Sequence, residues 1–73
     1  MPTHAEIFWQ QSAELFERWQ RLLERDPAHV RRECALYRRW ALSLEPSDRD
    51  SALIIEVLLE MLAELMVEAT LRE

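Results

Sequence analysis

The chain contains no glycine and no asparagine, and this absence limits the folds that it can adopt. Tight β-hairpin turns favour these two residue types, because both adopt positive φ angles at low cost. The turns of this chain must instead be built with proline and aspartate. We therefore predict an all-α fold.

Two prolines mark the boundaries between three predicted helices. Asp26 precedes Pro27 and is the expected N-cap of the second helix, whose first position tolerates a residue without an N–H group. The second helix should end before Pro46, because the residue preceding a proline avoids helical geometry. Ser47 is the expected N-cap of the third helix.

The predicted helices occupy nearly the whole chain. Thr3 and Glu6 have the spacing of a capping box, so the first helix should begin beside them. We expect helices over residues 4–25, 27–44 and 48–71, within a single domain of residues 1–73. The expected architecture is a three-helix bundle, in which a helical hairpin packs with a long C-terminal helix.

The third predicted helix is unusually apolar. Glutamate occupies every fourth position from Glu56 to Glu68, and these four side chains sweep an arc of about 120° on a helical wheel. Apolar side chains cover about 200° of the same wheel, whereas a helix with one neighbour needs roughly half as much. The first two helices each offer one ordinary apolar side, so we expect part of the third to stay uncovered in a monomer.

Self-association would cover this remaining apolar surface. Several Leu, Ile or Met side chains at ~1.5–3 kcal/mol each are a large share of the ~5–15 kcal/mol that stabilises a typical domain. We predict a homodimer or higher oligomer with the third helix at its centre; the alternative is a compact monomer. The predicted interface residues are Ile54, Ile55, Leu58, Leu59, Met61, Leu62, Leu65 and Met66.

A serine interrupts the apolar side of the first helix. Ser12 lies in line with Phe8 and Leu15, at a position where a bundle helix usually carries a large apolar residue. We expect its hydroxyl to bond back to the Phe8 carbonyl, one turn earlier. Alternatively, the small polar side chain lets another helix approach and sets its register.

Charge and composition disfavour several classes of partner. The formal charge is −5 and all nine basic residues are arginine, so the chain lacks the basic field that general nucleic-acid binding requires. The glutamates of the third helix exclude a membrane span and disfavour acidic lipid surfaces. The start of the chain shows no signal peptide and the single cysteine fits a reducing compartment, so we expect a cytoplasmic protein.

No group of residues predicts catalysis, a cofactor or a metal. The glutamates lack the Glu-x-x-His pattern of di-iron bundles, and His29 with Glu33 offers only two ligands. Cys34 lies on the apolar side of the second helix, where a thiol is unreactive. Without glycine there is no phosphate-binding loop. We expect neither an enzyme nor a small-molecule substrate.

Two features predict a protein partner. Arg31 and Arg38 form one column on the outer side of the second helix, and Arg32 and Arg39 form another. Trp9 lies about 80° from the centre of its helix's apolar side, so its ring should be partly exposed. Tryptophan and arginine are enriched in binding hot spots. The simpler alternatives are solvated arginines and a ring lying over the edge of the bundle.

We therefore predict a small, non-enzymatic protein–protein interaction module: an adaptor, a small chaperone or an inhibitor of a larger machine. One alternative is a dimeric DNA-binding regulator that uses the arginine-rich second helix, although base-reading asparagine and lysine are absent. A further alternative is a designed helical bundle with no natural activity, which the missing residue types would also fit.

Overall fold

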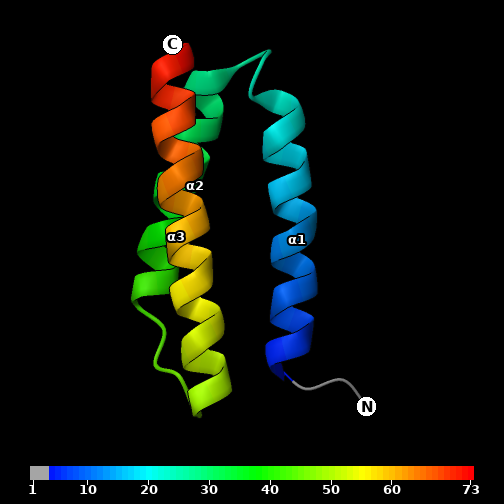
Figure 1. The fold of residues 1–73 in the computed structure, drawn as a ribbon, viewed down its shortest axis with the longest axis vertical. Helices are drawn as coiled ribbons and strands as arrows, with labels where there is room; N and C mark the ends of the chain where they lie inside the picture. The colour runs from blue at the N-terminus through cyan, green and yellow to red at the C-terminus, as the bar shows by residue number, and fades with distance from the viewer. Residues whose placement is uncertain (1–3) are drawn as a thin grey trace.

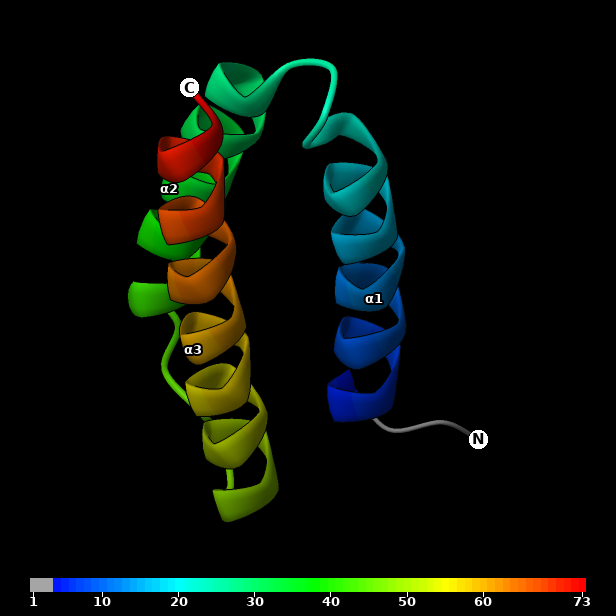
Figure 2. The same ribbon diagram turned by 45° about the horizontal axis from the view of Figure 1, so that its top comes forward.

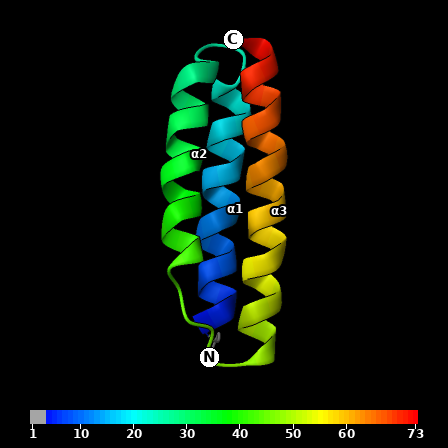
Figure 3. The same ribbon diagram turned by 90° about the vertical axis from the view of Figure 1, so that its left-hand side faces the viewer.

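A computed structural model describes residues 4–73 of the chain. It contains the helices α1 (His4–Leu22), α2 (Pro27–Leu42) and α3 (Arg49–Arg72). No strand occurs among the described residues, so the all-α prediction is confirmed. The helices run up, down and up along the long axis (Figures 1 and 3), so that α1 and α3 are parallel and begin at the same end.

The turn between α1 and α2 follows the local sequence. Asp26 caps α2 as predicted: its Oδ1 accepts a hydrogen bond from the His29 N–H at 3.2 Å, and Pro27 occupies the first position. α1 ends at Leu22 and not at residue 25. The Leu22 carbonyl accepts from the N–H groups of Arg25 and Asp26, at 3.0 and 2.8 Å. These two bonds close a tight turn in place of a further helical turn.

The N-cap of α3 is Asp48, and the prediction of Ser47 is wrong. Asp48 has extended backbone angles, φ −152° and ψ 176°, and its Oδ1 accepts from the Ser51 N–H at 2.7 Å. An N-cap needs this extended conformation, because it places the side-chain oxygen over the first turn. The bond from Ser51 also lowers the pKa of the Asp48 carboxyl. The Thr3 half of the predicted capping box lies outside the described residues.

α2 packs closely against α3, while α1 stands farther from both (Figures 1 and 2). Several buried side chains of the close pair are small, among them Cys34 and Ala41 in α2 and Ala69 in α3. Small side chains at a contact let two helix axes approach. Leu58 and Leu62 of α3 supply the larger buried side chains of this core.

α1 is joined to α2 through a chain of aromatic rings. Phe16 contacts Trp19 at 5.4 Å between ring centroids, Trp19 contacts Tyr37 at 5.6 Å, and Tyr37 contacts Trp40 at 5.1 Å. Trp40 in turn contacts Phe8 of α1 at 5.4 Å, so this row of contacting rings begins and ends on α1. Large rings fill a wider space than aliphatic side chains do, which explains why α1 lies farther away and yet packs against the core.

Ser12 bonds to a neighbouring helix and not to its own. The hydroxyl oxygens of Ser12 and Tyr37 lie 2.8 Å apart, with Ser12 buried between α1 and α2. The expected bond to the Phe8 carbonyl is therefore wrong. A buried polar pair of this kind is satisfied in only one alignment of the two helices, so it favours the observed register.

Removing either hydroxyl of this pair is expected to destabilise the fold, because the remaining hydroxyl loses its partner. Tyr37→Phe leaves the buried Ser12 hydroxyl unsatisfied and should cost about 1–3 kcal/mol, whereas Ser12→Ala leaves the half-buried Tyr37 and should cost less. The double variant should cost less than the sum of the two. Urea unfolding of the four proteins measures this coupling. Strictly additive losses would show that the hydroxyls act independently.

Two neighbours cover most of the apolar surface of α3 within one chain. Of the eight residues predicted to form an oligomer interface, Leu58, Leu62 and Leu65 are buried in the core and the other five are partly covered. The partly covered residues are Ile54, Ile55, Leu59, Met61 and Met66. The large apolar side chains that α3 leaves exposed are Leu53, Val57, Val67 and Leu71. Self-association stays a prediction, and these four residues are the most exposed large apolar side chains of α3 available for it.

Candidate protein-interaction surface

An apolar groove lies between the N-terminal parts of α1 and α3. Trp9 on α1 forms one wall, with 40% of its surface exposed, and Leu53 and Val57 on α3 form the other, at 52% and 43%. The groove has a volume of about 500 Å³. We call it the Trp9 groove; its lining is Glu6, Trp9, Gln10, Leu53, Ile54 and Val57.

Helix direction and spacing explain this groove. Because α1 and α3 are parallel (Figure 3), their N-terminal turns lie at the same end of the molecule. Leu53 and Val57 are one turn apart and therefore share one side of α3. Trp9 extends toward this side from the edge of α1, while half-buried Ile54 lies between the two walls. The predicted partial exposure of Trp9 is confirmed.

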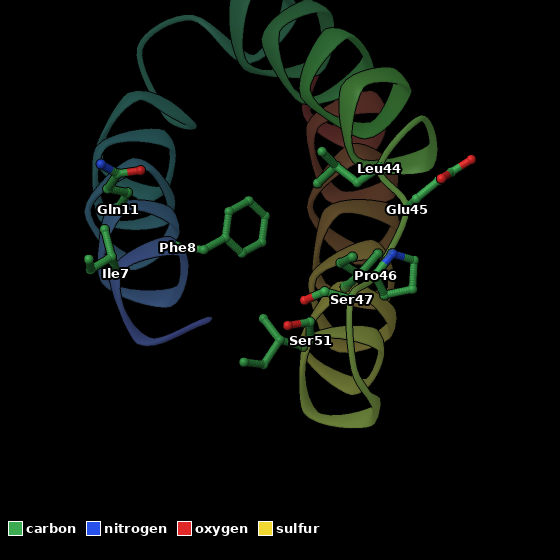
Figure 4. A pocket seen from close by; sticks show the side chains of 10 residues that line it. Ile7, Phe8, Gln11, Leu44, Glu45, Pro46, Ser47 and Ser51 are labelled. Atoms are coloured by element: carbon green, nitrogen blue, oxygen red, sulfur yellow. The ribbon is translucent and has the colours of Figure 1, made fainter. Parts of the chain in front are cut away.

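A second hollow, of about 350 Å³, lies between the start of α1 and the segment that joins α2 to α3. Figure 4 shows Phe8 pointing from α1 into the space opposite Leu44. Polar groups of Gln11 and Ser51 also line it. Ile54 lines both hollows, so the two adjoin each other at the end of the molecule where α1 and α3 begin.

The four arginines predicted to bind a partner do not form one uniform surface. Arg31 is held by Glu73 at the end of α3, with Nε–Oε2 and Nη2–Oε1 distances of 2.8 and 3.1 Å. Arg32, Arg38 and Arg39 are exposed, and none of them forms an ion pair within residues 4–73. None of the four lines the Trp9 groove, so the structure does not bring the two predicted binding features together.

The glutamates of α3 leave an exposed negative surface. Glu68 pairs with Arg72 at 3.1 Å. Glu56, Glu60 and Glu64 are exposed and form no ion pair in the described part of the chain. Negative charge is thus concentrated on α3, while α2 carries four arginines and one glutamate.

The potentially reactive groups are isolated. His29 and Glu33 lie 2.7 Å apart on the surface of α2, and among the side chains of residues 6–73 no three of His, Cys, Asp or Glu are grouped as metal ligands would be. Burial, with a smaller contribution from the nearby Glu33 charge, raises the pKa of the Cys34 thiol from 9.0 to about 12. A thiol with this pKa carries very little of the nucleophilic thiolate at neutral pH.

The raised Cys34 pKa predicts a loss of stability in alkaline solution. The unfolded chain releases the thiol proton above about pH 9, but the folded chain holds it until about pH 12. The thiol's contribution is therefore complete below pH 9 and declines as the pH rises toward 12. Denaturant unfolding should show a steeper alkaline loss for the natural chain than for Cys34→Ala. Parallel pH profiles for the two proteins would contradict this assignment.

Leu53 and Val57 were not predicted from the sequence as neighbours of Trp9 in a groove. The sequence did contain an indication of their exposure, because both residues interrupt the arc of glutamates on the outer side of the third helix. Their closeness to Trp9 depends on the packing of α1 beside α3.

Comparisons with protein-family models, with curated proteins and with solved structures found no match to this chain. None of the helices within residues 4–73 has the length and apolar character needed to cross a membrane.

Proposed function

We propose that this protein is a protein–protein interaction module that binds an apolar segment of its partner in the Trp9 groove. One observation carries the proposal: the exposed side chains of Trp9, Leu53 and Val57 converge from two helices on one groove. Contiguous exposed apolar surface of this kind is typical of binding sites. An adaptor, a small chaperone or an inhibitor would each use such a surface.

The groove suits a helical ligand. Two parallel helices provide its walls, and a third helix can place apolar side chains between them at intervals of three or four residues. Trp9 is a rigid, half-exposed aromatic side chain, which loses little conformational entropy when a partner covers it. Binding would recruit the partner or block its other contacts.

Photo-cross-linking in the native host tests this proposal. A photoreactive residue replacing Leu53 should trap a discrete protein, because position 53 lies in the groove. The same residue at position 71 is the matched control, since Leu71 is also an exposed leucine of α3 but lies outside the groove. Trp9→Ala should reduce the cross-link from position 53. Equal products from both positions would refute the groove as the binding site.

The exposed arginines of α2 support a second candidate function, binding to DNA. Arg32, Arg38 and Arg39 have no ion-pair partner within residues 4–73 and could contact phosphates. A regulator should show salt-sensitive DNA binding that disappears when these three residues are changed to alanine. Arg31 should be left in place, because its bond to Glu73 joins α2 to α3. The formal charge of −5 opposes this function, so DNA binding that survives these substitutions or is absent altogether would exclude it.

A further inference from the structure

We propose that the ligand of the Trp9 groove is a basic amphipathic helix, with apolar residues on one side and lysine or arginine along both edges. This inference rests on the proposed function of the groove and adds the chemical class of the partner. The inference is based on the charges of the residues that surround the groove.

Along α3, the apolar wall of the groove continues directly into carboxylates. Leu53, Val57, Glu60 and Glu64 follow one another at steps of four, three and four residues, which places them in one line on the helix surface. All four are exposed. A ligand helix lying in the groove beside this line would therefore have two apolar side chains and, over the next turns, two carboxylates along one edge.

The opposite edge, on α1, is also acidic. Glu6 and Gln10 line the groove, and the same line continues through Ala13 to Glu17 at steps of three and four residues. All four of these side chains are exposed. No arginine lines the groove. Both edges thus present negative charge to a ligand.

Charge complementarity selects among possible ligands. Lysine or arginine on the edges of a bound helix would lie near Glu60 and Glu64, whereas glutamates there would be repelled. The α3 helix of a second copy would bring its own glutamate row to these positions, so that pairing is disfavoured. A basic amphipathic helix from another protein is complementary both to the apolar walls and to the acidic edges of the groove.

Two synthetic helical peptides test the inference against the full chain. Both carry the same leucines at positions i, i+3, i+4 and i+7; one has lysine along its edges and the other has glutamate. Fluorescence anisotropy of the labelled peptides should show at least about tenfold tighter binding of the lysine peptide at low salt, with a smaller difference at higher salt. The double variant Glu60→Gln, Glu64→Gln should reduce this preference several-fold.

A matched pair of valine variants separates the charge of the ligand from the groove itself. Val57→Ser should weaken the binding of the lysine peptide, whereas Val67→Ser, at an exposed valine of α3 outside the groove, should not. Circular dichroism confirms that both variants fold.

Each alternative result has a distinct meaning. Equal binding of the two peptides, still weakened by Val57→Ser, would overturn the inference about charge and leave the groove in place. Binding that is unaffected by Val57→Ser, or no binding of either peptide, would overturn the groove as well. A dimer in sedimentation that Val57→Ser dissociates would show that a second copy occupies the groove, which also overturns the inference.

Discussion

Trp19→Ala is expected to destabilise the protein by about 3–5 kcal/mol, because it removes the central ring between α1 and α2. Only 2% of Trp19 is exposed. Its ring contacts Phe16 within α1 and Tyr37 of α2, with centroid distances of 5.4 and 5.6 Å. A loss of this size is comparable to the whole stability of many small domains, so much of the variant should be unfolded at 25 °C.

Trp9→Ala is the matched control for this experiment. It makes the same chemical change on the same helix, but at a ring that is 40% exposed, and should cost less than half as much. Urea unfolding monitored by circular dichroism measures both. Equal losses at the two positions would show that α1 is not held by the aromatic chain.

Trp19→Phe separates the packing of the ring from its polar group. The Trp19 Nε1–H is buried and has no hydrogen-bond partner within residues 4–73. A buried donor without an acceptor is destabilising, so its removal should offset part of the packing lost with the smaller ring. Trp19→Phe should therefore retain much more stability than Trp19→Ala.

Leu62→Ala is expected to cost about 2–5 kcal/mol, because it opens a cavity where α3 meets the core. Leu62 is 0% exposed within a single chain. Leu71→Ala is the control: Leu71 is on the same helix but 80% exposed, and its truncation should change stability by less than about 0.5 kcal/mol.

Repeating the Leu62→Ala experiment at several protein concentrations tests whether Leu62 is buried within one chain or by a second copy. If one chain covers Leu62, the loss should be the same across a dilution series. If a second copy covers it, the measured stability of the natural chain should itself rise with concentration. A destabilisation by Leu62→Ala that appears only at concentrations where the chain associates would contradict the burial of Leu62 seen within one chain.

The helix ends show where local sequence is sufficient to predict structure. The cap of α2 was predictable because Asp26 stands directly before a proline that suits only the first helical position. The cap of α3 was not, because Ser47 and Asp48 are adjacent and both are good caps. The choice between them depends on the path of the chain from α2 to α3, which residue identity does not specify.

The candidate site was also predictable from local sequence only in part. The partial exposure of Trp9 followed from its angle on one helix. The bond that holds Arg31 did not, because its partner Glu73 lies at the end of another helix. The groove did not, because its second wall comes from Leu53 and Val57, more than forty residues away in the sequence. Its existence depends on the distance and direction at which α1 lies beside α3.

Local sequence was sufficient to predict that this chain forms three helices and that α2 begins after Asp26, because capping, proline geometry and apolar periodicity act over a few residues. The sequence did not predict which apolar residues of α3 remain exposed or that Ser12 bonds to Tyr37. Both outcomes depend on how whole helices are positioned against one another. That positioning is set by the combined packing of many side chains, above all the aromatic rings that join α1 to α2.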